Sequence, residues 1–489
     1  MKKYILGAVV LTVLFTTGCR KIESDGEIQV VVVNGGGGST TGQTIILQGR
    51  INADTLLRKQ NTYILKGLVY VVGNHTMTIE AGTTVKGSFS GSDVAALIIT
   101  RGSKLMASGT PSEPIIFTSA SPNPQSGDWG GIVLCGKASV NTAFAGTGGG
   151  PGVYEVEGGI NNANSDGLAG GGTSPDDNDN SGTLKYVRIE FAGYAFQPDK
   201  EINSLTMAAV GRGTTIDHIQ VAYAKDDAYE WFGGTVNCKF LIAYKTQDDD
   251  FDTDNGYSGK VQFGLIMRDS VIADISNSEA FESDNNATGT TATPKTTAIF
   301  SNITAIGPRA TLSNIGNSLF RGAAHIRRNT GISIFNSIIM GWPRGIEIDA
   351  SSGTSTALNI EDSTLRLRNI TLAGNTVNTR FSGTGGATIT NDATFASWFT
   401  NSYYNNDILT NVSDARLIQP YNYAAPDPTP FATNSTGGGG NAKINTGGGF
   451  TDPKFTGDTF FDQTVVFRGA VAPAGELASW WKGWTKFNY

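Results

Sequence analysis

The sequence predicts an all-β solenoid in which the chain winds as a coiled parallel β-helix. Three acidic segments each contain an aromatic residue that is followed at once by a carboxylate. These aromatic residues are Tyr229, Phe251 and Phe281, and they lie 22 and 30 residues apart, as in a repeated coil that is lengthened by insertions. Apolar runs rich in Val, Ile, Phe and Tyr are bounded by Gly, Asn, Asp and Thr, and almost no stretch has a helical pattern.

The start of the chain predicts an export signal over residues 1–19. Two lysines precede an apolar stretch at residues 4–15, which is too short to span a bilayer. The sequence Thr-Thr-Gly-Cys that follows is similar to the lipobox of bacterial lipoproteins, although Thr16 stands where that motif usually has Leu. This resemblance implies a lipid anchor at Cys19, and a plain secretory signal is the alternative.

Residues 20–43 are predicted to form a flexible acidic and Gly-rich tether. Their acidic start resembles the surface-export signal of Bacteroidetes lipoproteins, which implies an outer-membrane protein that is lipid-anchored and exposed at the cell surface. An acyl anchor would hold the protein at the membrane, since each buried CH2 contributes roughly 0.8 kcal/mol. No later apolar run is long enough to predict a second membrane segment.

Composition narrows the possible partners. The formal net charge is −7, which argues against nucleic acid and against anionic lipid surfaces as partners. Gly accounts for 63 of 489 residues, which fits a chain with many tight turns. Beyond Cys19 the only cysteines are Cys135 and Cys238, which we expect to be buried free thiols because they would lie several coils apart.

Residues 44–375 contain the repeated coil. Leu-Met-Ala-Ser-Gly-Thr at 105–110, Pro-Ile-Ile-Phe-Thr at 114–118 and Trp-Gly-Gly-Ile at 129–132 follow one another. This series resembles right-handed parallel β-helix proteins of the pectate-lyase-like superfamily, and the resemblance implies that fold for this region. Further on, Asn residues recur at spacings of 34 and 33 in the predicted coils, which predicts a buried Asn ladder formed by Asn302, Asn336 and Asn369.

Two segments interrupt or follow the coils. Residues 145–183 are Gly-rich and predict a long insertion with almost no regular structure. Residues 376–489 lose the coil pattern and predict an irregular C-terminal extension. Its aromatic end, residues 480–489, is predicted to cap the open end of the solenoid, because solenoids must cover their terminal coils.

The acidic segments are the best candidate site. In a coil, equivalent positions stack ~4.8 Å apart, and two carboxylates ~5 Å apart cost about 3 kcal/mol at an effective dielectric near 20. Ca²⁺ offsets such repulsion because it binds several hard oxygen ligands. The spacing of Gly256 excludes an EF-hand, and a solvated acidic rim or a site for a cationic ligand are the alternatives. The predicted Ca²⁺ ligands are Glu230, Asp250, Asp252, Asp254, Glu282 and Asp284.

The stacked aromatic residues Tyr229, Phe251 and Phe281 are predicted to form a ligand-binding face with the acidic ladder. We therefore expect a non-catalytic binding or accessory protein for an extracellular glycan or for a TonB-dependent uptake complex. One alternative that the resemblance implies is a Ca²⁺-dependent polysaccharide lyase, because lyases of this fold use Ca²⁺ together with a Lys or Arg as base. The candidate arginines are Arg321, Arg327 and Arg328. A glycoside hydrolase and a structural or adhesive surface protein are the remaining alternatives.

Overall fold

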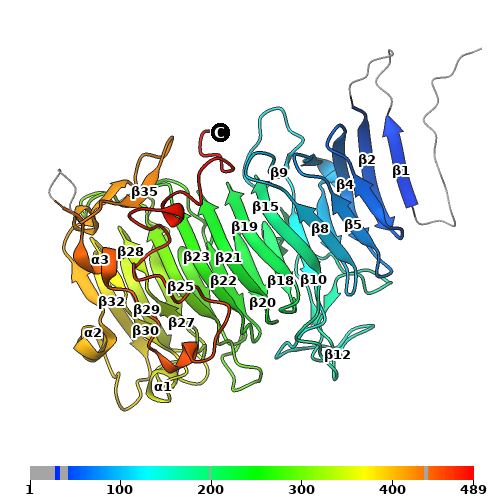
Figure 1. Ribbon diagram of the computed structural model, residues 1–489. Helices are drawn as coiled ribbons and strands as arrows, with labels where there is room; N and C mark the ends of the chain where they lie inside the picture. The colour runs from blue at the N-terminus through cyan, green and yellow to red at the C-terminus, as the bar shows by residue number, and fades with distance from the viewer. Residues whose placement is uncertain (1–27, 34–41, 198–199, 434–438) are drawn as a thin grey trace, which may run out of the picture.

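The computed structural model describes residues 28–33, 42–197, 200–433 and 439–489. This part of the chain forms one right-handed parallel β-helix, whose coils stack from the N-terminal to the C-terminal end (Figure 1). Its strands join in a single sheet of 27 strands, almost all parallel, so the predicted fold class is confirmed. Cys19 lies outside the described residues. The helices of the described chain are short, and none has the length and apolar character needed to cross a bilayer.

One row of strands, which we call the site sheet, carries the acidic segments. Successive side chains of a strand point to opposite faces, so each of these strands sends alternate residues into the core. The row consists of β7 (Ala96–Ile99), β10 (Gly131–Cys135), β18 (Leu205–Ala208), β20 (Tyr229–Phe232), β22 (Phe251–Asp254), β24 (Ser278–Ser283), β26 (Phe320–Ile326), β29 (Arg344–Ala350) and β32 (Val377–Gly383).

The other strands complete the coils. They are β2 (Thr44–Ile51), β3 (Thr55–Leu57), β4 (Thr62–Val71), β5 (Thr76–Ile79), β6 (Thr84–Gly87), β8 (Lys104–Ser108), β9 (Ile115–Ser119), β15 (Gly182–Glu190), β19 (Thr215–Ala222), β21 (Asn237–Tyr244), β23 (Lys260–Met267), β25 (Ile299–Ile306), β27 (Ser333–Phe335), β28 (Ile338–Met340), β30 (Leu367–Arg368), β31 (Thr371–Ala373) and β33 (Asp407–Leu409). Short elements outside the coils include β16 (Ala195–Gln197), β17 (Lys200–Glu201), β34 (Leu417–Gln419), β35 (Asp427–Pro430) and α1 (Leu358–Glu361).

The predicted Asn ladder is present at a bend between two faces of the coil. Asn302, Asn336 and Asn369 adopt φ values of 59°, 50° and 56°, in the left-handed region that Asn tolerates better than most residues. The Asn336 amide donates to the Ser301 hydroxyl at 3.0 Å, and the Asn369 amide donates to Asn336 Oδ1 at 2.9 Å. In earlier coils the same bend is occupied by aromatic rings, which stack in the order Tyr186, His218, Phe240 and Phe263.

Both ends of the coil differ from the expectation. Residues 28–33, which were predicted to be part of the tether, form strand β1 (Ile28–Val33), and β1 pairs antiparallel with β2. At the other end, β32 and β33 continue the parallel pairing past residue 375, where the coil was predicted to stop. Helix α2 (Asp392–Phe399) follows β32 and places Phe395 and Phe399 in the core.

The Gly-rich insertion packs against the solenoid and has little regular structure, as expected for residues 145–183. It contains two short hairpins, and its residues Val156, Ile160 and Ala169 pack on the outer face of the first strands of the site sheet. The insertion therefore covers β7, β10 and β18. The hairpins pair β11 (Ala143–Phe144) with β12 (Gly150–Pro151) and β13 (Tyr154–Glu155) with β14 (Leu168–Ala169).

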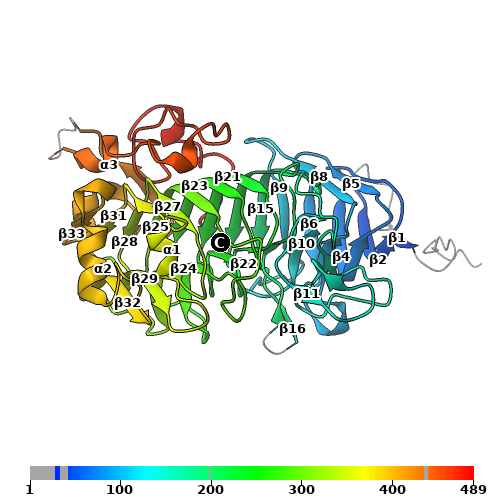
Figure 2. The same ribbon diagram turned by 90° about the horizontal axis from the view of Figure 1, so that it is seen from below.

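Residues 447–489, which follow α3 (Ala442–Thr446), form a strap along the side of the solenoid. Figures 1 and 2 show this segment running back from the last coils toward the middle of the molecule. Trp484 packs edge-on against Tyr186 and His218 at centroid distances of 5.7 Å for both rings. The aromatic end is thus attached to the middle coils. The prediction that it caps the open end of the solenoid is wrong.

Candidate functional site

The carboxylates stack on the site sheet in the predicted register. Glu230 pairs with Asp252 and Asp252 pairs with Glu282, so the three acids form one row across β20, β22 and β24. The row is preceded by Thr206 on β18 and followed by His325 on β26. Neighbouring coils therefore bring together acids that are 22 and 30 residues apart in the sequence.

The predicted aromatic ligand-binding residues are in the core, so that prediction is wrong. The exposed fractions are 0% for Tyr229, 0% for Phe251 and 1% for Phe281. Each residue directly precedes an outward-facing carboxylate, and strand alternation turns it inward. The Tyr229 hydroxyl lies 2.9 Å from the carbonyl oxygens of Ile219 and Ile242, which satisfies its polar end inside the solenoid.

Asp250 is also separated from the other predicted Ca²⁺ ligands. Its carboxylate accepts a 2.7 Å hydrogen bond from Arg268 Nε, and both side chains are fully buried. The Arg268 guanidinium also donates to the carbonyl oxygens of Thr246, Asp248 and Glu279. Asp250 therefore has a structural role, in which Arg268 fixes the turns that carry the neighbouring acids.

The remaining predicted ligands line one cavity of about 580 Å³, which we call the acidic groove. Twelve carboxylate residues and three basic residues contribute to its wall, so negative charge is in large excess. The acids are Glu157, Glu201, Asp226, Asp227, Glu230, Asp248, Asp249, Asp252, Asp254, Asp274, Glu282 and Asp284. The bases are Lys225, Arg327 and Arg328. The Gly-rich insertion supplies Glu157 from outside the coil, a contact that no sequence pattern indicated.

Two oxygen clusters within the groove have the geometry of cation sites. One ligand oxygen each from Asp226, Asp227 and Asp248 lie within 4.8 Å of one another, and the same holds for Asp227, Glu230 and Asp252. Asp227 belongs to both clusters. Asp226, Asp227 and Asp248 belong to the predicted acidic segments but were not among the predicted ligands, although the pairs 226–227 and 248–249 repeat at the same spacing of 22 residues as Tyr229 and Phe251.

Burial and mutual repulsion favour the protonated acids in the groove. The pKa values of Asp227, Glu230 and Asp252 are raised well above their usual range, first by burial and then by the neighbouring carboxylates. The same causes raise the pKa of Asp254 to about 7. Burial raises the pKa of Asp248 to about 8. A bound cation would reverse this preference, because it stabilises the charged carboxylates.

Buried polar atoms without partners border the second cluster. Thr206 precedes Glu230 in the row, is 1% exposed, and its hydroxyl has no hydrogen-bond partner. The neighbouring Leu205 pairs with the core residue Tyr229, so alternation directs Thr206 to the same face as Glu230. Asp252 Oδ1 is likewise buried and unpartnered. Such atoms are costly in a folded protein unless a ligand or water completes their bonding.

Two of the three candidate catalytic arginines line the groove. Arg327 Nε donates to Asp284 at 2.8 Å, Arg328 Nη1 donates to Asp284 at 2.6 Å, and Arg327 also pairs with Glu282. Burial alone would lower the pKa of Arg327, but Glu282 and Asp284 outweigh burial and raise it. A general base must release its proton near neutral pH, so this arrangement fits Arg327 to hold charge and not to abstract a proton.

Arg321 does not line the groove, and it lies in an ion-pair network that reaches the groove only through the 3.8 Å contact of His325 with Glu282. It contacts Glu347 at 3.2 Å and Glu279 at 3.7 Å. His325 lies in the same network, 3.4 Å from Glu279 and 3.2 Å from Asp349. Burial would lower the pKa of His325, but its acidic partners raise it to about 10, so the ring is an imidazolium at neutral pH. The row is therefore balanced by cations at Glu282 on β24, whereas Glu230 and Asp252 form no ion pair within the described part of the chain.

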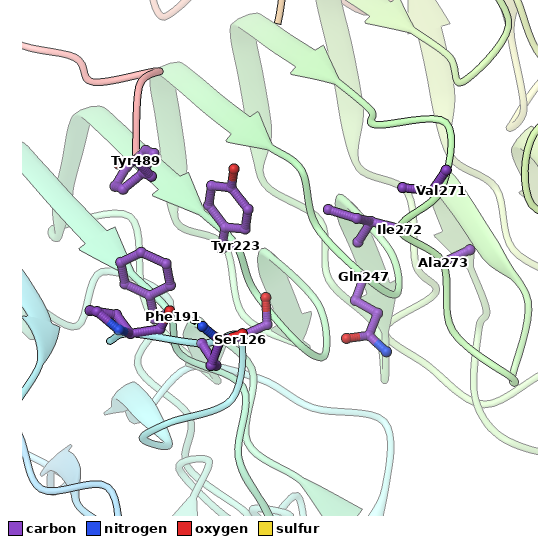
Figure 3. Close-up of a pocket in the computed structure, with 10 residues that line it drawn as sticks. Ser126, Phe191, Tyr223, Gln247, Val271, Ile272, Ala273 and Tyr489 are labelled. Atoms are coloured by element: carbon purple, nitrogen blue, oxygen red, sulfur yellow. Dashed lines mark hydrogen bonds between the residues drawn. The ribbon is translucent and has the colours of Figure 1, made fainter. Parts of the chain in front are cut away.

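A second cavity, of about 600 Å³, lies at the neighbouring corner of the coil (Figure 3), and we call it the aromatic pocket. In Figure 3, Phe191, Tyr223 and Tyr489 face Val271, Ile272 and Ala273 across the pocket. Its lining residues are Pro124, Gln125, Ser126, Phe191, Tyr223, Gln247, Val271, Ile272, Ala273 and Tyr489.

Comparison with known proteins places the fold in a family. A family model described as a pectate-lyase-like β-helix domain matches residues 49–412. No curated protein and no solved structure matches the chain. The match spans the parallel coils from β2 to β33, including all strands that carry the acidic groove. The chain therefore belongs to the pectate-lyase-like β-helix domain family.

Proposed function

We propose that the protein binds Ca²⁺ in the acidic groove and holds an extracellular glycan on this face without cleaving it. The observation that carries the proposal is the pair of oxygen clusters that share Asp227, in a groove with twelve carboxylate residues and three basic ones. Ca²⁺ prefers oxygen ligands of this kind, and the unpartnered Thr206 hydroxyl beside Glu230 adds a neutral one. The cation would in turn offer open positions to glycan hydroxyl or carboxylate groups.

Ca²⁺ is expected to raise the melting temperature of the unlipidated chain, residues 20–489, by several degrees over its value in EDTA. Binding to the folded state alone stabilises a protein by about 2.7 kcal/mol at a ligand concentration one hundred times the dissociation constant. In Asp227→Asn/Asp252→Asn this rise should disappear, because the variant removes the acid shared by both clusters and a second ligand. Calorimetric melting measures both effects.

Asp93→Asn is the matched control, since Asp93 is an exposed acid paired with Lys66 at 3.1 Å and lies outside the groove. It should keep the full response to Ca²⁺. A wild-type chain whose melting temperature is the same in EDTA and in Ca²⁺ would refute the cation site, and a response that survives in the double variant would place it elsewhere.

Attachment to the outer membrane through Cys19 is part of the proposal. It is supported by the similarity of residues 16–19 to a lipobox and by the acidic and Gly-rich sequence that follows. When cells that express the protein are grown with an alkyne-tagged fatty acid, the protein should become labelled. The substitution Cys19→Ala should remove the label. Labelling that persists in Cys19→Ala would refute the anchor. A TonB-dependent uptake complex is the partner that the lipoprotein resemblance implies.

A Ca²⁺-dependent polysaccharide lyase is the second candidate function, because Arg327 and Arg328 line the same groove as the carboxylates. The contacts of both arginines with Asp284 favour binding over proton abstraction. Incubation with acidic polysaccharides in Ca²⁺ distinguishes the two functions. Unsaturated products that vanish in Arg328→Ala would establish the lyase, and their absence together with glycan binding supports the non-catalytic function.

A further inference from the structure

We infer that the aromatic pocket is a binding site for a neutral sugar ring, and that it continues into the acidic groove as one site for a glycan chain. This inference rests on the proposed function, because it names the part of the surface that would recognise the glycan.

The chemistry of the aromatic pocket suits an uncharged, amphipathic ring. None of the ten lining side chains is acidic or basic, and they combine aromatic faces, amides and hydroxyls. Phe191 and Tyr223 stack at 5.5 Å and 25°, while Tyr489 meets Phe191 at 90°. A sugar ring presents C–H groups on its faces and hydroxyls at its rim. Aromatic surfaces suit the C–H groups, and the amides of Gln125 and Gln247, which line the pocket, offer hydrogen-bonding atoms for the hydroxyls.

The aromatic residues are not required by the backbone at these positions. Phe191 and Tyr223 have φ values of 62° and 57°, in the left-handed region that bulky residues seldom adopt. In the next coil the same turn position is occupied by Lys245, with φ 55°. Since the turn accepts a lysine, the two rings have a role other than forming the turn. Their fixed backbone also reduces the conformational entropy that a ligand would need to remove.

The two cavities adjoin along one loop. In the loop between β23 and β24, residues 271–273 line the aromatic pocket and residues 274–277 line the acidic groove. The neighbouring residues Gln247 and Asp248 are divided between the cavities in the same way. Two aliphatic side chains of this loop are strongly exposed, Val271 at 70% and Ile275 at 86%. A chain molecule that occupies the pocket would pass beneath this apolar edge to reach the carboxylates.

The test uses the unlipidated chain and a panel of neutral hexasaccharides, namely cellohexaose, xylohexaose and mannohexaose, with binding measured by calorimetry and saturation-transfer NMR. At least one should bind the wild type. Tyr223→Ala should weaken that binding by about tenfold or more, because it removes one of the three aromatic rings that line the pocket. Tyr223→Phe should bind like the wild type. Gln247→Ala, at the junction of the cavities, should also weaken binding and gives a second variant if Tyr223→Ala is poorly folded.

Tyr403→Ala is the matched control, since Tyr403 is 59% exposed and lies outside both cavities. It should not change glycan binding. Absence of binding to every neutral hexasaccharide, or binding that Tyr223→Ala and Gln247→Ala leave intact, would overturn the inference. Either result can occur while Ca²⁺ still raises the melting temperature, so the failure of the pocket is distinguishable from the failure of the cation site. Glycan binding by a chain whose melting temperature does not respond to Ca²⁺ would show that the cation site fails while the pocket holds.

Discussion

Arg268→Met is expected to lower the free energy of unfolding by about 3–5 kcal/mol, which is the usual cost of breaking a buried ion pair. Arg268 and Asp250 are both fully buried and lie 2.7 Å apart. The substitution would leave the Asp250 carboxylate without its cation and would remove the donor to Thr246, Asp248 and Glu279 carbonyl oxygens. Since the Asp248 carbonyl belongs to a residue that lines the groove, the response to Ca²⁺ should weaken as well. Chemical denaturation measures the stability.

Arg380→Met is the control, because Arg380 is 46% exposed and pairs with the exposed Asp392. Its effect should stay within about 0.5 kcal/mol. The double variant Arg268→Met/Asp250→Leu should recover part of the lost stability, since it removes the unpaired charge. A loss below about 1 kcal/mol in Arg268→Met would show that the pair is not a structural anchor.

In EDTA, the melting temperature is expected to fall as pH rises from about 5 to 8. Asp248 and Asp254 have pKa values raised to about 8 and about 7, so the folded protein binds more protons than the unfolded chain in this range. These protons stabilise the folded state fully at a pH below the pKa values of the two acids in the unfolded chain. The stabilisation is lost as pH rises through their pKa values in the folded protein. His325 has its pKa raised to about 10, so its contribution to stability also falls as pH rises above the pKa of an unfolded histidine. Asp349, with its pKa lowered, acts only at more acidic pH.

Ca²⁺ should remove most of this pH dependence, because a cation replaces the protons as the partner of the carboxylates. Its stabilising effect should accordingly grow from pH 5 to pH 8. Asp248→Asn/Asp254→Asn should flatten the profile in EDTA, while the exposed Asp93→Asn should not change it. A melting temperature that rises with pH in EDTA would contradict the raised pKa values and the electrostatic argument for the groove.

The stacking of the acids could be predicted from sequence because it depends on two local regularities. Coil length sets which residues are neighbours, and strand alternation sets which face they share. The first placed Glu230, Asp252 and Glu282 in one row correctly. The second should have excluded Tyr229, Phe251 and Phe281 as ligand contacts, since a residue next to an outward carboxylate in a strand faces inward.

Other features depend on contacts that no local pattern encodes. Asp250, Asp252 and Asp254 follow one another at intervals of two residues, which in a strand would place them on one face. Asp250, however, precedes the first residue of β22, and its side chain turns inward at the corner. Its partner Arg268 follows 18 residues later, in no recognisable motif. The aromatic end was expected at the open end of the solenoid, but its docking depends on pairs such as Gln220 with Lys486, which are 266 residues apart.

The strap changes how the solenoid is expected to come apart. In a solenoid where each coil contacts only its neighbours, the terminal coil can detach while the rest stays folded. Here the strap is bonded both to Gln220 on β19 and to Asn302 on β25, and Arg468 of the strap pairs with Asp407 on β33. Detachment of the last coil would therefore also break contacts between the strap and the middle coils. The strap acts as a longitudinal tie, so loss of the last coils and of the middle ones should occur as one cooperative event.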